Sequence, residues 1–121
     1  MDRGAFGQLG EDLACEELSR RGYAILERRF RTRCGELDII ARDGNVLVFV
    51  EVKARSDGRF GHGFDAITWH KRHRLSRMAV SYLFLHHLPA AACRFDVVAV
   101  TGRLPGPFHV EVLQNAFTLE P

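Results

Sequence analysis

Asp43-Gly44 separates two runs of strand-forming residues, 36–41 and 46–54, and this short connection constrains the fold more than any other feature of the sequence. An Asp-Gly pair is typical of the two-residue turn of a β-hairpin, so the two runs are expected to pair antiparallel. If residues 43 and 44 form the turn, Arg42 pairs with Asn45, and the numbers of cross-strand partners sum to 87. The turn therefore predicts which side chains share each face of the sheet.

Four charged side chains then project from one face of the hairpin: Glu36, Asp38, Glu51 and Lys53. The predicted register places Glu36 opposite Glu51. It also places Asp38 opposite Phe49 and diagonal to Glu51, roughly 7 to 8 Å away at the backbone. A three-residue turn would reverse the parity and point Asp38 away from Glu51.

Carboxylates this close repel one another, so the cluster favours a positive partner. Lys53 supplies one charge, and a divalent metal held by carboxylate oxygens would supply the rest, which is how Mg²⁺ is bound in sites of phosphoryl transfer. The alternative is a solvated sheet face on which Lys53 acts only as a structural counter-ion.

Two segments carry apolar residues at helical spacing. The first covers residues 5–21, and the second follows a cap at Asp65 or Thr68 and ends before Pro89. Glu11 falls along the edge of the apolar stripe of the first helix, so it could point at the sheet. An acid in that position is more often solvated.

Further strands are expected at residues 23–30 and 94–101, with a short edge strand at 109–113. The strand at 94–101 has a nearly continuous apolar run interrupted only by Asp96, which is typical of a strand covered on both faces. Strand, long helix and strand in succession form a crossover unit. The strands at 46–54 and 94–101 are therefore expected to lie parallel in one sheet.

The length of 121 residues suits one compact α/β domain, residues 1–121, and its 46% hydrophobic content is that of an ordinary globular protein. No apolar run approaches the roughly 20 residues of a membrane-spanning helix, and no signal peptide is evident. A cytoplasmic protein with no membrane contact is expected. Cys15, Cys34 and Cys93 lie far apart and are expected to be free, reduced thiols. The six histidines have no ligand spacing that would indicate a zinc centre.

Basic residues flank the acidic cluster in two stretches, although the net charge is only +2. These stretches comprise Arg28, Arg29, Arg31 and Arg33, and then Lys53, Arg55, Arg59, Lys71, Arg72, Arg74 and Arg77. Lys71 lies near the start of the second helix, where phosphate binds readily. We predict that Arg55, Lys71 and Arg74 contact a nucleic-acid backbone. The alternative is a solvated basic face, with Lys71 extending past apolar neighbours.

Asp38 and the Glu51-Val52-Lys53 triplet resemble the signature of the PD-(D/E)XK nucleases, with Leu37 in place of the proline. Nearly the whole chain resembles the YraN family of predicted endonucleases. This resemblance rests on Gly7-x-x-Gly10-Glu11-Asp12-Leu13-Ala14, Gly35-Glu36-Leu37-Asp38-Ile39-Ile40, Val48-Phe49-Val50-Glu51-Val52-Lys53-Ala54-Arg55 and Arg94-Phe95-Asp96-Val97-Val98. It implies a restriction-endonuclease-like αβββαβ core with a mixed sheet flanked by helices. It also implies that Glu11, Asp38 and Glu51 bind metal and that Lys53 is catalytic.

The expected function is therefore hydrolysis of phosphodiester bonds in nucleic acid, with DNA favoured, by one or two Mg²⁺ or Mn²⁺ ions. Lys53 would position the attacking water or stabilise the charged transition state. One alternative is a catalytically idle module that docks nucleic acid or a partner protein. Another is a hydrolase of small phosphorylated molecules, although the sequence has no phosphate-cradling glycine-rich loop. A branched substrate would require two active sites and hence a homodimer.

Overall fold

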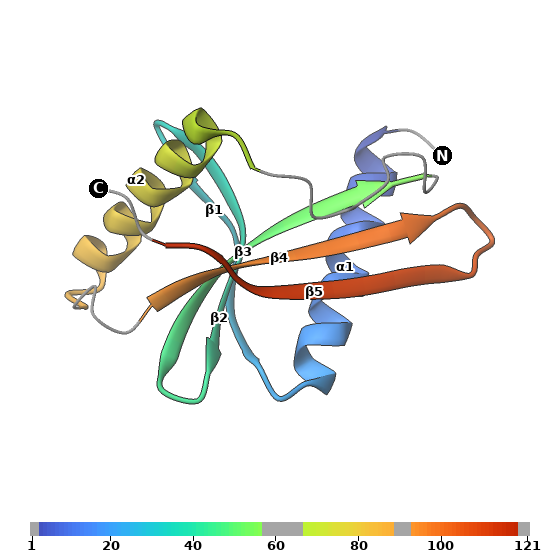
Figure 1. Ribbon diagram of the computed structural model, residues 1–121, viewed down its shortest axis with the longest axis horizontal. Coiled ribbons are helices and arrows are strands. Elements are labelled where there is room, and N and C mark those ends of the chain that lie inside the picture. Colours follow the sequence, from blue (N-terminus) through green and yellow to red (C-terminus); the bar gives the residue numbers. More distant parts are fainter. Residues whose placement is uncertain (1–2, 57–66, 89–92, 119–121) are drawn as a thin grey trace.

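The fold is a five-stranded sheet with two helices, and the computed structural model describes residues 3–56, 67–88 and 93–118 (Figure 1). The elements in chain order are α1 (Arg3–Arg20), β1 (Ala24–Thr32), β2 (Gly35–Asp43), β3 (Val46–Arg55), α2 (Trp69–Leu85), β4 (Cys93–Gly102) and β5 (Phe108–Phe117). This order confirms the α/β class and the αβββαβ succession of the expected restriction-endonuclease-like core, to which β5 adds an edge strand. None of the described helices is long and apolar enough to cross a membrane.

Thr68 begins α2 as its N-cap, because its side-chain oxygen accepts the backbone N–H of Lys71 at 3.2 Å. The other expected cap, Asp65, lies outside the described residues. At the end of α1, Gly22 adopts a φ of +95°, which lets the chain turn back so that Tyr23 donates its N–H to the carbonyl of Leu18.

The strands lie in the order β1-β2-β3-β4-β5, and β3 and β4 are parallel, as the crossover predicts. Residues 95–100 of β4 are all buried, in agreement with a strand covered on both faces. The edge strand β5 is longer than the expected 109–113. Asn115, at a φ of +55°, donates its N–H to the Asp96 carboxylate across an irregularity in the pairing, and β5 continues beyond it.

The register of the β2–β3 hairpin differs by two residues from the predicted one. Asp43 pairs with Val46, so Gly44 and Asn45 form the turn and the partner numbers sum to 89. Gly44 has a φ of +63°, and glycine suits the first central position of a type II′ hairpin turn. The predicted pairing of Arg42 with Asn45 is therefore wrong.

Asp38 also does not face Phe49, which pairs instead with Ile40. A shift of two residues keeps the parity, because side chains alternate with a period of two. The last pair of the ladder is Ile39 with Val50. Extending this register by one residue would set Asp38 directly opposite Glu51, where the predicted register made them diagonal.

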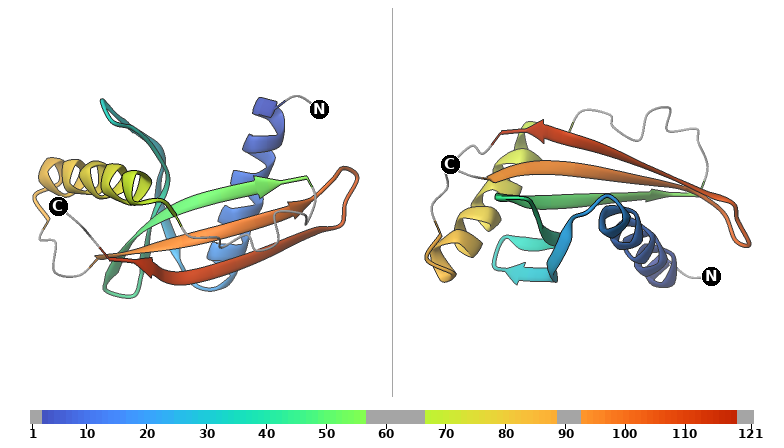
Figure 2. Two further views of the ribbon diagram at one scale, coloured as in Figure 1. Left: turned by 45° about the horizontal axis from the view of Figure 1, so that its top comes forward. Right: turned by 90° about the horizontal axis from the view of Figure 1, so that it is seen from below.

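The two helices cover opposite faces of the sheet, seen from two further directions in Figure 2. Phe49 packs in one core cluster with the apolar side chains of α2, whereas its neighbours Val48 and Val50 pack in the other with Ala14 and Leu18 of α1. Adjacent residues of a strand point to opposite faces, so each helix buries one face of β3.

The far end of the β1–β2 hairpin curves away from the other strands and lies beside α2 (Figures 1 and 2). Phe30 meets Tyr82 edge to face with ring centroids 5.3 Å apart, and a Cβ on Gly35 would lie 3.6 Å from the Met78 sulfur. This packing draws the start of β2 toward α2. Before Ile39, the residues of β2 are no longer paired with β3. Asp38 lies at this point of separation.

Candidate functional site

Asp38 lies at the fork where β2 leaves β3. Its Oδ2 atom accepts the backbone N–H of Val52 at 2.7 Å, just beyond the last ladder pair of Ile39 and Val50. The carboxylate therefore satisfies a β3 donor beyond the end of the β2–β3 ladder. Its position is fixed by the strand that carries Glu51 and Lys53.

Burial, followed by the negative charge of Glu51, raises the pKa of Asp38 to about 7. The hydrogen bond from Val52 and the charge of Lys71 act in the opposite direction, and the charge of Glu11 adds to the rise. The negative charges of Glu51 on β3 and Glu11 on α1 therefore both act on the Asp38 carboxylate. Two carboxylates that resist being charged together favour a cation between them.

Glu51 forms an ion pair with Lys71 of α2, with Nζ and Oε1 2.8 Å apart. The Glu51 side chain is 12% exposed and that of Lys71 is 35% exposed. Lys71, predicted as a phosphate contact, is thus directed at the acidic site in this structure. Arg74, three residues further along α2, is exposed to solvent.

Glu11 is buried at the sheet, as the edge of the α1 stripe allowed, and two arginines of β1 hold it. Arg28 Nε donates to its Oε1 at 2.8 Å, and Arg29 Nε lies 3.3 and 3.4 Å from its two oxygens. Arg28 also donates to Asp12 at 2.6 Å. The sequence indicated a basic stretch here but not its pairing with Glu11.

The remaining predicted residues lie around this cluster. Glu36 does not oppose Glu51: it faces Arg31 of β1 and forms an exposed ion pair with it at 3.0 Å. The hairpin's divergence from β3 explains the difference. Lys53 is half-buried, two residues after Glu51 and so on the same face of β3, and Arg55 is exposed at the end of that strand.

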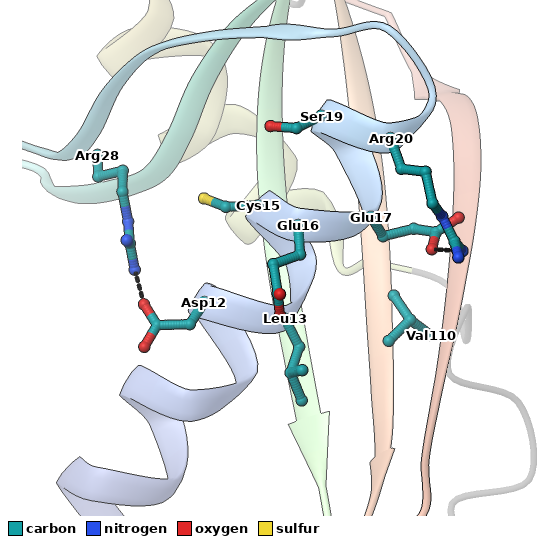
Figure 3. A pocket seen from close by; sticks show the side chains of 9 residues that line it. All are labelled: Asp12, Leu13, Cys15, Glu16, Glu17, Ser19, Arg20, Arg28 and Val110. Atoms are coloured by element: carbon teal, nitrogen blue, oxygen red, sulfur yellow. Dashed lines mark hydrogen bonds and ion pairs between the residues drawn. The ribbon is translucent and has the colours of Figure 1, made fainter.

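A hollow of about 770 Å³ opens between α1 and the ends of β2 and β3. Its lining includes Glu11, Arg29, Glu36, Asp38 and Arg55. A second hollow, of about 700 Å³, lies along α1 and is lined by such residues as Asp12, Cys15 and Val110 (Figure 3). Asp38 lines the first hollow and not the second, whereas Glu51 lines neither, so Asp38 and Glu11 make the first hollow the candidate site.

The donor set fits a hard divalent cation held by two carboxylates. Within residues 3–56, 67–88 and 93–118, no three His, Cys, Asp or Glu side chains are close enough to form a metal cluster. Mg²⁺, however, is commonly bound by only one or two carboxylates, with water and substrate phosphate completing its shell. Asp38 and Glu51 meet that requirement, whereas Glu11 would first have to exchange its arginines for the ion.

Comparison with known proteins gives a consistent family match. The model of the uncharacterised protein family UPF0102 matches residues 10–100. The chain is 46% identical over 111 residues to a UPF0102 protein of Parafrankia sp. (strain EAN1pec), which covers 92% of this chain and 94% of that protein. It is 44% identical over 117 residues to one of Geobacter metallireducens, covering 95% and 93% of the two chains.

Among solved structures, the chain is similar to Pyrococcus furiosus SfsA in complex with Ca²⁺, with a TM-score of 0.44 and 15% sequence identity. The match covers 93% of this chain, which spans 64% of the length of the SfsA chain.

Proposed function

The chain belongs to the UPF0102 family, and from its acidic site we propose that it is a metal-dependent endonuclease that hydrolyses phosphodiester bonds of nucleic acid, with DNA as the favoured substrate. One observation carries the proposal: the Asp38 carboxylate is held at the fork of β2 and β3 by the Val52 N–H, and there burial and the charge of Glu51 raise its pKa to about 7. A site built this way is costly unless a cation joins it.

Asp38 and Glu51 would hold Mg²⁺ or Mn²⁺, which when bound polarises the phosphate and makes water a stronger nucleophile. The Val52 N–H keeps the Asp38 carboxylate in one orientation. Lys53 donates to the phosphate oxygens as negative charge builds on them, which is worth most in a partly buried site. Arg55 and Arg74 contact the nucleic-acid backbone on either side.

A second candidate, an idle module that docks nucleic acid or protein, is supported by the arginines on Glu11 and the lysine on Glu51. These cations already neutralise part of the acidic cluster. In that case the ion pairs replace the metal, and the basic residues alone bind the partner. Cytoplasmic location and a homodimer remain predictions.

The deciding experiment is cleavage of single-stranded, duplex and branched DNA, and of RNA, with Mn²⁺. We expect cleavage by the native chain and none by Asp38→Asn, whose side chain keeps the shape but not the charge. Binding that weakens with salt but never leads to cleavage would favour the idle module. The solution mass, measured alongside, determines whether two sites are available for a branched substrate.

A further inference from the structure

Trp69, the chain's single tryptophan, is exposed at the first residue of α2. It is 55% exposed, and its ring stacks on His73 with centroids 4.9 Å apart and planes inclined by 14°. His70 meets it edge-on at 5.1 Å. These three rings are here called the aromatic platform: Trp69 and His73 lie nearly parallel, His70 stands edge-on to Trp69, and the group is partly open to solvent.

The aromatic platform begins in the same helical turn as a side chain of the acidic site. Lys71 follows Trp69 by two residues, about 3 Å along the helix axis. From that turn Lys71 reaches Glu51 at 2.8 Å, and its charge acts on Asp38. Residues two apart on a helix point roughly 200° apart, so the platform and Lys71 lie on different sides of this first turn. A single strand would have to pass around the start of α2 to contact both.

The charge of α2 indicates what kind of partner fits. The helix carries Lys71, Arg72, Arg74 and Arg77 and contains no aspartate or glutamate. Packing α2 against α2 of a second copy would bring like charges together, whereas an anionic partner is attracted. Nucleic acid supplies phosphates for the arginines and flat bases for the aromatic rings.

We propose that the aromatic platform stacks an unpaired base of a nucleic acid whose backbone enters the acidic site. Bases inside a duplex are stacked on their neighbours and offer no free face, so the substrate class is single-stranded nucleic acid or a duplex with unpaired bases. The part of this inference that leads the backbone into the acidic site for cleavage rests on the proposed nuclease function. The stacking itself does not, because it requires no metal.

The test uses the fluorescence of the native chain in EDTA, where only Trp69 emits as tryptophan. A short oligothymidylate should quench this emission as it binds. A duplex of the same length at the same salt should bind through its phosphates with little quenching. Fluorescence anisotropy of labelled oligonucleotides measures binding independently of the quenching.

Variants separate stacking from charge. Trp69→Ala should weaken single-strand binding by roughly 5- to 100-fold, and Trp69→Phe should keep most of the affinity. Phe84→Ala is the matched control, because Phe84 is an 80% exposed aromatic residue on the same helix, about four turns away. It should bind as the native chain does. The loss in Trp69→Ala should persist at high salt, whereas the loss in Arg74→Ala should shrink.

Binding without quenching, together with unchanged affinity in Trp69→Ala, would overturn the platform. So would a shift of Trp69 emission by anionic phospholipid vesicles but not by oligonucleotides, which would indicate a membrane surface instead. Quenching with no cleavage under Mn²⁺ would leave the platform standing and reject only the nuclease. Cleavage that is unchanged in Trp69→Ala and equal for single-stranded and duplex substrates would support the nuclease and reject the platform.

Discussion

The Asp38 carboxylate accepts the backbone N–H of Val52 at 2.7 Å, which ties the acid of β2 to the middle residue of the Glu51-Val52-Lys53 triplet on β3. The bond forms where the ladder has just ended, after the pair of Ile39 and Val50. The three residues with proposed catalytic roles thus stay in fixed relation although their strands diverge.

In metal-free buffer, the protein should lose stability as the pH rises from about 4 to about 7. The folded-state pKa of Asp38 is about 7, above its unfolded value of about 3.9, so the folded state holds this proton more tightly. Its contribution is complete below the unfolded value and is lost as the pH rises through the folded value. Asp38→Asn mimics the protonated acid and should flatten this part of the profile. Urea unfolding of both proteins across this range measures it, and parallel profiles would contradict the assignment.

Mn²⁺ or Mg²⁺ should raise the melting temperature of the native chain. An ion that binds only the folded state adds about 2.7 kcal/mol at a hundredfold excess over its Kd, roughly 5 to 15 °C for a domain of this size. Asp38→Asn should abolish the rise without lowering metal-free stability. Glu11→Gln should reduce it but not remove it, because arginines compete for that carboxylate. Equal rises in native and Asp38→Asn proteins would place the ion elsewhere.

Lys53→Met should keep the metal-induced rise in melting temperature and lose cleavage by roughly 100- to 1,000-fold. The lysine is proposed to act on the reacting phosphate and not as a ligand. Single-turnover kinetics measures the loss directly. A variant that also fails to respond to metal would show that Lys53 is needed to build the site.

Glu11→Gln should lower metal-free stability by about 1 to 3 kcal/mol, because it leaves Arg28 and Arg29 without their buried counter-ion. The matched control is Asp12→Asn. Asp12 pairs with the same Arg28, but its side chain is 47% exposed, so its loss should cost less than about 1 kcal/mol. Denaturant unfolding compares the two, and equal losses would mean that the buried pair has no special role.

Two glycines of α1 should respond oppositely to alanine. A Cβ on Gly10 would lie 2.8 Å from the Ala54 Cβ, so Gly10→Ala should force α1 away from β3 and cost about 1 to 3 kcal/mol. A Cβ on Gly7 meets nothing within 4 Å, and Gly7→Ala should stabilise the helix by up to about 1 kcal/mol. Melting temperatures test both signs. Because Glu11 follows Gly10, only Gly10→Ala should also weaken metal binding.

The sequence by itself determined the elements, because apolar periodicity is local. The strands and helices lie within a few residues of their expected bounds, and the parallel pairing of β3 with β4 followed from the crossover. The parity of the β2–β3 ladder also survived, since a two-residue shift in register changes no face, although the ladder ends at Ile39 and Val50, just before Asp38 and Glu51. The sequence could not determine which two of residues 43–45 form the turn, because both Asp43-Gly44 and Gly44-Asn45 are good turn pairs.

Only the tertiary structure decided the partners within the site. Arg28 reaches Glu11 across 17 residues, and Lys71 reaches Glu51 across 20, through the docking of α1 and α2 on opposite faces. The raised pKa of Asp38 likewise requires the burial and divergence of its strand. Periodicity indicates which face of an element is buried. It does not encode how far apart two charges on different elements come to lie, because that distance depends on the packing of the whole domain.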